Sequence, residues 1–328
     1  MPRTADNAIE TRTIALIGAR GHTGAELIRL LDGHPHFQLA LASSRELAGE
    51  SVSAHVEGVA TDLLFENIAP ADLAERTFDC VILALPNGAG DAYVKGLDRG
   101  GRDTRAPLLI DISSDHRFDD SGAWVYGLPE HFREHIKDAK RIANPGCYAT
   151  AMQIALRPVL DLLEGPPHVF GVSGYSGAGT TPSERNDPAR LHNNLLPYTL
   201  IGHTHEREAS RHLGHPVRFM PHVAPFFRGI TLTVSMEFKA KQSVEGLCER
   251  YQRAYGQEPL IEFGPSIPEV REIANCHTVR LGGLALDEAG RHAVIIATID
   301  NLLKGAATQA IQNLNLACGS EELAGIQP

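Results

Sequence analysis

The segment that decides the fold lies near the start of the chain, where residues 13–31 read TIALIGARGHTGAELIRLL. It opens with a short apolar run typical of a buried strand, and apolar residues return at helical spacing over Leu27–Leu31. Between them, Gly18, Gly21 and Gly24 have the order that permits a tight turn, close approach of a pyrophosphate and close helix–strand packing. A strand, a glycine turn and a helix in this order predict a dinucleotide-binding domain.

The end of the next predicted strand indicates which dinucleotide binds. Phe37–Ala42 is apolar and leads into Ser43, Ser44 and Arg45. Enzymes that use NAD usually have an acidic residue here for the ribose 2′-hydroxyl, whereas hydroxyls and a guanidinium suit a 2′-phosphate. This pattern favours NADP (NADPH), although Ser-Ser-Arg is also an ordinary surface turn. The candidate cofactor-binding residues in these two segments are Gly18, Arg20, Gly21, His22, Thr23, Gly24, Ser43, Ser44 and Arg45.

Two further apolar runs predict that this domain has a parallel sheet. Cys80–Leu85 and Leu108–Ile112 are continuously apolar, as strands buried on both faces are. Pro86 follows the first run, at the strand end where open α/β sheets bind ligands, and is a further cofactor candidate. Arg117 follows the second run and could hold a carboxylate or phosphate, or equally pair with a neighbouring aspartate.

The segment Asn144–Thr150 reads NPGCYAT and supplies a candidate nucleophile. Pro and Gly interrupt the chain, and a helix is expected over Ala149–Leu163, so Cys147 lies at or just before a helix start. There the helix dipole and unpaired N–H groups should lower the pKa of the thiol and stabilise an oxyanion. Most free cysteines are instead buried and inert. A thiolate beside a nicotinamide can hold an acyl group as a thioester, which then accepts hydride.

Taken together, these motifs resemble the N-acetyl-gamma-glutamyl-phosphate reductase family, relatives of the aspartate-semialdehyde dehydrogenases. NPGCY together with DNLLKGAA is specific for it, whereas the glycine pattern alone is not. The resemblance implies reduction of N-acetyl-L-glutamate 5-phosphate by NADPH, through a Cys147 thioester, to the 5-semialdehyde and phosphate in arginine biosynthesis. The matching stretches cover nearly the whole chain in the family order and are Gly18–Leu27, Tyr126–Glu130, Asn144–Thr150, Ser173–Gly179, Arg228–Ile230 and Asp300–Ala307.

The family pattern His-x-His-x-x-Glu matches His203, His205 and Glu208. In a helix, His205 and Glu208 would share a face, so Glu208 could fix the imidazole tautomer. One histidine would stay protonated as the proton donor; which one remains open, with a slight preference for His205. The alternative of a metal site that includes His212 lacks an HExxH motif or cysteine partners, and we expect no metal.

The expected fold class is α/β, a Rossmann-type domain plus an α+β catalytic domain. The latter should have a mixed sheet, because polar and apolar residues alternate in its β-rich stretches. The predicted domains are 1–146 for NADP binding, 147–300 for catalysis, and 301–328 as a helix returning to the first domain. The resemblance adds Ser176, Gly177 and Asn301 to the cofactor candidates and gives Arg117, Asn144, Arg228 and Lys304 as substrate candidates, although Lys304 could equally pair within the last helix.

Composition limits the partners. Of 328 residues, 30 are Lys or Arg and 40 are Asp or Glu, and the net charge of −10 argues against nucleic-acid or anionic-membrane partners. Five cysteines without a C-x-x-C pair, and no hydrophobic export segment in Met1–Arg12, indicate a cytoplasmic protein. We expect a small anionic substrate and a homo-oligomer, dimer or tetramer. The competing functions are reduction of a carrier-linked acyl phosphate, and NADP-dependent redox sensing without turnover.

Overall fold

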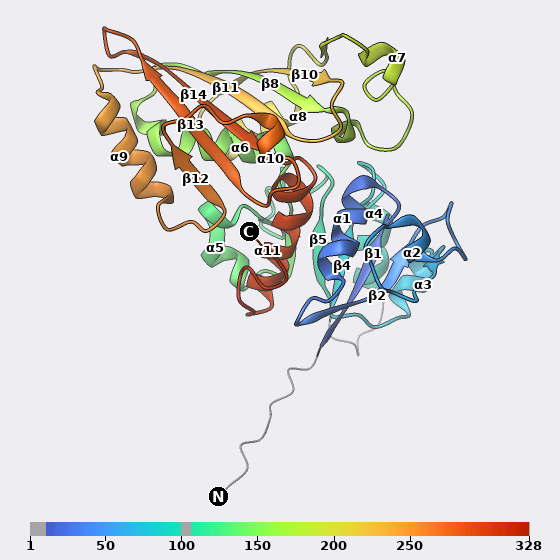
Figure 1. Cartoon of the computed structure of the whole chain (residues 1–328). Coiled ribbons are helices and arrows are strands. Elements are labelled where there is room, and N and C mark those ends of the chain that lie inside the picture. The colour runs from blue at the N-terminus through green and yellow to red at the C-terminus, as the bar shows by residue number, and fades with distance from the viewer. Residues whose placement is uncertain (1–10, 100–105, 328) are drawn as a thin grey trace, which may run out of the picture.

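The structure is a computed structural model that describes residues 11–99 and 106–327. It has two seven-stranded sheets, one in each half of the molecule, with helices packed on both (Figure 1). The expectation that the first twelve residues carry no export segment lies almost entirely outside the described residues. None of the described helices is long and apolar enough to cross a membrane.

The first sheet is parallel throughout, with strand order β3-β2-β1-β4-β5-β7-β6. The central strands β4 and β5 are buried at every residue, as their continuous apolar runs predict. Its strands are β1 (Arg12–Ile17), β2 (Phe37–Ser43), β3 (Phe65–Glu66), β4 (Cys80–Leu83), β5 (Leu108–Asp111), β6 (Val125–Tyr126) and β7 (Arg141–Ala143).

Successive residues of β1 enter two different cores, because side chains of a strand alternate between its faces. Ile14 and Leu16 pack with α1 and with the last helix, α11, whereas Ala15 and Ile17 pack on the other face with α3 and α4. The C-terminal helix α11 therefore packs against the first sheet, where it also contacts α5. The helices around this sheet are α1 (His22–Leu31), α2 (Val52–His55), α3 (Pro70–Ala74), α4 (Asp91–Arg99), α5 (Pro129–Lys137) and α11 (Thr308–Ala317).

The second sheet is mixed, with order β12-β13-β14-β11-β8-β10-β9. Pairs β8–β10 and β12–β13 are parallel and the others antiparallel, so the predicted fold class is confirmed. Its strands are β8 (His168–Gly174), β9 (Leu196–Pro197), β10 (Arg218–Ala224), β11 (Ile230–Glu237), β12 (Ile261–Gly264), β13 (Val279–Leu286) and β14 (His292–Ile299). The helices of this half are α6 (Cys147–Leu156), α7 (Pro188–Leu191), α8 (Thr204–Leu213), α9 (Val244–Tyr255) and α10 (Val270–Ile273).

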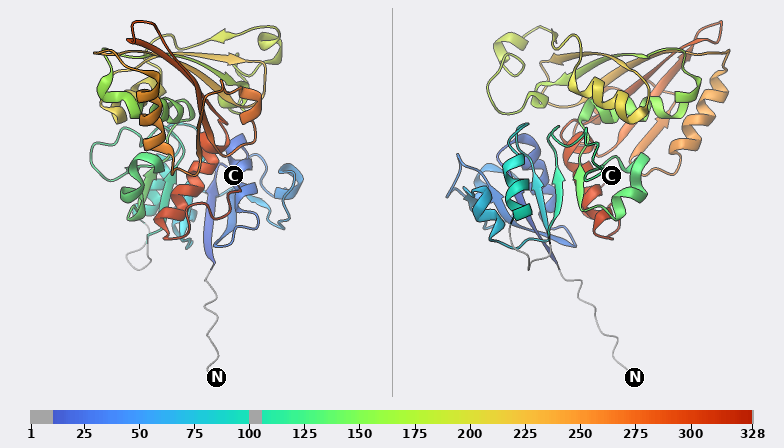
Figure 2. Two further views of the ribbon diagram at one scale, coloured as in Figure 1. Left: turned by 60° about the vertical axis from the view of Figure 1, so that its left-hand side comes forward. Right: turned by 180° about the vertical axis from the view of Figure 1, so that it is seen from behind.

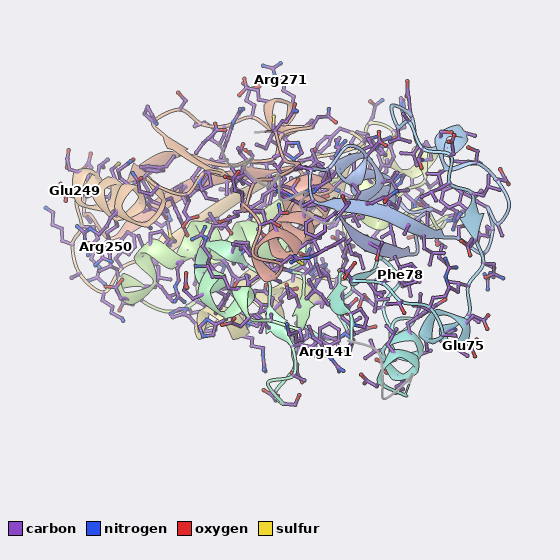
Figure 3. All side chains as sticks on the ribbon, turned by 90° about the horizontal axis from the view of Figure 1, so that it is seen from below. Glu75, Phe78, Arg141, Glu249, Arg250 and Arg271 are labelled. Carbon is purple, nitrogen blue, oxygen red and sulfur yellow. The ribbon has the colours of Figure 1, made fainter. Side chains whose placement is uncertain are left out.

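Helices α6 and α8 lie between the second sheet and the rest of the chain (Figures 1 and 2). One face of this sheet packs on α6, α8 and α9 to form the largest core. The opposite face carries partly exposed side chains, among them Phe170 and Met220. Seen from below, Glu249 and Arg250 of α9 lie near one end of the molecule and Glu75 and Phe78 near the other (Figure 3).

Two helices have bounds in the structure that differ from those predicted from the sequence. The helix expected over Ala149–Leu163 begins at Cys147 and ends at Leu156, where a 3₁₀ segment, Arg157–Leu162, takes over. Pro158 explains the change, because proline has no N–H for the helical hydrogen bond. The helix expected from Asn301 begins as a π-helical turn, Leu303–Ala307, that continues into α11.

Candidate active site

One cavity of about 870 Å³ brings together segments that are far apart in the sequence. The β1–α1 turn, the ends of β2, β4 and β5, the start of α6 and the π-helical turn all contribute to its wall. Cys147, His205 and Arg117 line it together with every residue predicted to bind the cofactor. These are Gly18, Arg20, Gly21, His22, Thr23, Gly24, Ser43, Ser44, Arg45, Pro86, Ser176, Gly177 and Asn301.

The three glycine positions of the first turn differ in what a side chain there would contact. Gly18 has a φ of +88°, and a Cβ there would lie 2.4 Å from the carbonyl oxygen of Ala84. A Cβ on Gly24 would lie 2.5 Å from the carbonyl oxygen of Ala19, so this glycine allows α1 to pack closely on the turn that follows β1. On Gly21 a Cβ would meet no protein atom closer than 3.9 Å. Protein packing therefore does not require Gly21, and its missing side chain leaves space for a ligand.

The residues of this turn fit a dinucleotide phosphate. Helix α1 begins at His22, directly after Gly21, and no side chain caps its first N–H groups. Uncapped N–H groups at a helix start bind phosphate oxygens. At the end of β2, the Oγ of Ser44 accepts a hydrogen bond from the N–H of Leu47 at 3.1 Å. Arg45 is exposed and forms no ion pair within residues 11–99 and 106–327, so its guanidinium is available for a 2′-phosphate.

Cys147 is the first residue of α6, as predicted, and Gly146 precedes it in an extended conformation. The predicted effect on the thiol is wrong for the protein without ligands. Burial raises the pKa of Cys147 to about 11, although the N–H of Tyr148 and the charge of Arg117 act in the opposite direction. Desolvation therefore outweighs the helix start, and the resting residue is a neutral thiol that needs a base.

His205 lies against the loop that precedes this thiol, lines the same cavity and can supply the base. A Cβ on Gly146 would lie only 2.3 Å from Nε2 of His205, so the glycine lets the imidazole reach the loop before Cys147. Burial and the charge of Arg117 lower the pKa of His205 well below its ordinary value of 6.5. The expectation of a permanently protonated donor is therefore corrected, because the imidazole is neutral in the resting protein and can accept a proton.

His203 has a different position. Its Nδ1 accepts a hydrogen bond from the N–H of His205 at 3.1 Å and so caps the start of α8. Its ring packs edge-on against Tyr148 and Phe219 and does not line the cavity. Burial lowers the pKa of His203 to about 4. The geometry thus favours His205 as the acid–base group.

Glu208 does not orient a histidine, contrary to the prediction. Its carboxylate is fully buried, and Oε1 accepts hydrogen bonds from the N–H of Gly146 and the hydroxyl of Tyr126, each at 2.8 Å. Oε2 accepts from Nη1 of Arg117 at 3.0 Å. Both oxygens are occupied, so Glu208 fixes the loop before Cys147 and the guanidinium of Arg117. It is a positioning residue.

The same loop is also held by Arg117 and Asn144. Nε of Arg117 donates to the carbonyl oxygen of Asn144 at 2.9 Å, and Nη2 donates to that of Ile112 at 2.6 Å. The amide of Asn144 donates to the carbonyl oxygen of Ala306 and accepts from Asn313. Asn144 is fully buried outside the cavity wall, so it joins this loop to the C-terminal helix and does not reach a substrate.

The structure also contradicts the prediction that Arg228 binds the substrate. Its guanidinium lies 3.0 Å from Glu26 of α1 and 2.7 Å from Asp300 after β14. It therefore links the first helix of one half to the last strand of the other, and it does not line the cavity.

The prediction that Lys304 binds the substrate is wrong for a similar reason. Its Nζ is fully buried, 2.7 Å from Oε1 of Glu130, and donates to Gln309 at 3.2 Å and Gln312 at 2.6 Å. The adjacent Gly305 packs against the nucleophile, since a Cβ there would lie 2.7 Å from the Cβ of Cys147. The Lys304–Glu130 pair thus fixes the π-helical turn behind Cys147.

Replacing Lys304 by methionine is expected to destabilise the protein by about 3–5 kcal/mol, because the buried Glu130 is left unpaired. Urea unfolding measures this loss. The double variant Glu130→Gln, Lys304→Met should recover part of it, because no buried charge then lacks a partner. An unchanged unfolding free energy combined with a raised KM for substrate would contradict the structural role.

The sequence interpretation missed one basic residue in the cavity wall, Arg185, in the segment between β8 and α7. No motif marks it, and only the path of residues 180–202 brings it to the site. Within the described residues, no group of three or more His, Cys, Asp or Glu side chains is placed to hold a metal ion.

One cavity therefore combines a glycine turn suited to a dinucleotide, a cysteine at a helix start and a neutral imidazole. This combination defines a class of protein, the cysteine-dependent dehydrogenases that reduce an activated acyl group. Comparison with known proteins agrees. Residues 13–139 match the semialdehyde dehydrogenase NAD-binding domain, and residues 147–301 match the semialdehyde dehydrogenase dimerisation domain.

Two curated relatives are named N-acetyl-gamma-glutamyl-phosphate reductase. The protein from Xanthomonas euvesicatoria is 53% identical over 97% of this chain and 99% of its own length. The protein from Stenotrophomonas maltophilia is 52% identical over 96% of this chain and 98% of its own length. The chain therefore belongs to the N-acetyl-gamma-glutamyl-phosphate reductase family, and the resemblance predicted from its motifs is confirmed.

Solved structures support the fold. The Vibrio cholerae aspartate semialdehyde dehydrogenase II complexed with ASA superposes with a TM-score of 0.74 at 19% identity and covers 94% of this chain and 99% of its own. The Candida albicans aspartate semialdehyde dehydrogenase with NADP has a TM-score of 0.71 at 15% identity and covers 94% of this chain and 98% of its own.

Proposed function

We propose that this protein reduces N-acetyl-L-glutamate 5-phosphate with NADPH to N-acetyl-L-glutamate 5-semialdehyde and phosphate, a step of arginine biosynthesis. The observation that carries the proposal is the shared cavity. Cys147, His205 and Arg117 line it next to the glycine turn of the first domain. Relatives with this name match the chain over nearly its full length.

The first half of the reaction is acyl transfer to the cysteine. The sulfur of Cys147 attacks the acyl carbon while the neutral imidazole of His205 takes the thiol proton. The bond between the acyl carbon and the phosphate oxygen breaks, phosphate leaves, and a thioester forms on Cys147. The N–H groups at the start of α6 stabilise the oxyanion that develops on the acyl oxygen.

The second half releases the aldehyde. When bound, NADPH would supply the hydride that reduces the thioester to the anion of a thiohemiacetal. His205 holds the proton taken from the thiol, and returns it to the sulfur when the carbon–sulfur bond breaks and the semialdehyde leaves. Glu208 keeps the loop and Arg117 in place through both halves.

The cofactor's 2′-phosphate belongs beside Arg45 in this proposal. Replacing Arg45 by alanine is expected to lower the NADPH-to-NADH ratio of kcat/KM by about tenfold or more, the loss of one charge-assisted contact. Steady-state kinetics with both cofactors measure the ratio. Lys95→Ala on α4, an exposed site outside the cavity, is the matched control. An unchanged ratio in Arg45→Ala would refute the 2′-phosphate assignment.

The reverse reaction tests the proposed function directly. The protein should reduce NADP in the presence of N-acetylglutamate 5-semialdehyde and require phosphate to do so. If NADP is not reduced under these conditions, the chain is not this reductase. Comparing this semialdehyde with a carrier-linked one tests the competing substrate, which would need a basic docking surface on a chain of net charge −10.

The proposal includes a homo-oligomer that works in the cytoplasm. Residues 147–301 match a dimerisation domain, and Phe170 and Met220 on the open face of the second sheet are each 38% exposed. Cys80, Cys147, Cys248, Cys276 and Cys318 are free thiols, which suits a reducing compartment. Analytical ultracentrifugation tests the oligomeric state.

A further inference from the structure

The arginines of the cavity wall differ in whether an acidic side chain already neutralises them. Arg20 lies 2.6 Å from Glu46, and Arg117 lies 3.0 Å from Glu208. Arg45 and Arg185 also line the cavity and form no ion pair with any described residue. Arg45 follows β2, at the cofactor end. Arg185 is therefore the cation that remains uncompensated elsewhere in this wall.

The acidic neighbours of Arg185 in the chain have other partners. Glu184 pairs with Arg190 at 3.5 Å, and Asp187 caps α7 by accepting a hydrogen bond from the N–H of Ala189. The charge of Arg185 is thus not cancelled locally. A half-buried guanidinium that lines a cavity without a counter-ion is suited to bind an anionic group of a ligand.

A row of aromatic rings connects Arg185 to the nucleophile. The guanidinium carbon of Arg185 lies 5.0 Å from the centre of the Tyr198 ring. The Tyr198 ring is 5.5 Å from that of His203, which is 5.0 Å from that of His205 beside Cys147. After burial, the charge of Arg185 is the next cause that lowers the pKa of His203. Besides burial, the charges of Cys147 and Arg185 both shift the pKa of Tyr198, so Tyr198 lies near both groups. Arg185 is thus on the side of the cavity where the substrate reacts.

The proposed substrate carries two anionic groups at opposite ends. Its acyl phosphate must lie at Cys147, where Arg117 contacts the same loop through Glu208 and Asn144. Its α-carboxylate is separated from the acyl carbon by the side-chain methylenes and therefore needs a second cation away from the sulfur. We propose that Arg185 binds this α-carboxylate and so selects the substrate, an inference that rests on the proposed function.

The test uses Arg185→Gln in the reverse reaction. The KM for N-acetylglutamate 5-semialdehyde is expected to rise about 10- to 100-fold, as for loss of a charge-assisted hydrogen-bonded pair. The KM values for phosphate and NADP should not change. Arg190→Gln, five residues further on and outside the cavity, should behave like wild type. Arg185→Lys should recover part of the affinity because it keeps the charge.

A substrate without the carboxylate separates binding from a merely structural role. With 4-acetamidobutanal, which lacks only the α-carboxylate, wild type and Arg185→Gln should have the same kcat/KM. An unchanged KM for the natural semialdehyde would overturn the inference. So would a raised KM for phosphate or NADP, or an equal loss with 4-acetamidobutanal. Absence of wild-type activity with the natural semialdehyde would instead reject the proposed function.

Discussion

Replacing Cys147 by serine is expected to lower kcat by about 10⁴-fold or more, the scale seen when a covalent nucleophile is removed. A hydroxyl is harder to deprotonate than a thiol, and an alkoxide leaves the tetrahedral intermediate less readily than a thiolate. NADPH binding should be nearly intact, because the glycine turn and Arg45 belong to other elements. Steady-state kinetics and titration of NADPH fluorescence measure the two effects.

Cys248→Ser is the matched control for this variant, since Cys248 is a partly exposed cysteine on α9 outside the cavity. It should retain wild-type activity and NADPH affinity. Normal activity in Cys147→Ser would remove the thioester from the mechanism. Loss of NADPH binding in the same variant would show that Cys147 acts through the structure of the cofactor site.

Replacing His205 by glutamine is expected to lower kcat by about 10²- to 10⁴-fold, because the thiol loses its general base. His203→Asn is the control, since asparagine also caps a helix and should preserve the start of α8. Its kcat should stay near that of wild type. If His203→Asn were the more damaging change, the assignment of the two histidines would have to be exchanged.

The pH profile provides a second measurement for His205. Burial lowers its pKa below 6.5, so the neutral base persists as the pH falls and is lost only below that value. The acid limb of kcat/KM in wild type should therefore lie below pH 6.5. In His205→Gln the profile should lack that limb. An acid limb at or above pH 6.5 would contradict a buried neutral imidazole.

Most of the cofactor site could be predicted because its signals are local. Gly18, Gly21 and Gly24 lie within one turn, and Arg45 directly follows its strand. The carboxyl ends of parallel strands meet at one edge, so these residues share a cavity once the strand order is known. The position of Cys147 is equally local, because Pro145 and Gly146 mark the helix start.

The substrate cations could not be assigned in this way, because a charge cannot be called available until its partner is known. Arg228 pairs with Glu26, 202 residues earlier in the chain, and Lys304 with Glu130 across the same core. Arg185 is the reverse case. It has no ion pair among the described residues, but nothing in its local sequence distinguishes it from a surface arginine. Only the tertiary structure separates neutralised cations from free ones.

The protonation states of Cys147 and His205 differ from those predicted from the sequence for a related reason. A helix start favours a thiolate, and the sequence predicts this local effect for Cys147. The opposing effect, desolvation in the cavity wall, depends on segments that pack around the thiol from other parts of the chain, and it is the larger. The same burial makes His205 neutral, so the two resting states complement each other.

Trapping the acyl enzyme tests the central claim most directly. The protein is incubated with N-acetyl-L-glutamate 5-phosphate without NADPH, quenched in acid, and analysed by intact and peptide mass spectrometry. We predict a mass increase of one N-acetylglutamyl group, located on the peptide that contains Cys147, with loss of the adduct when NADPH is added before the quench. An adduct on a different residue, or turnover with no acyl group ever attached to Cys147, would contradict the account.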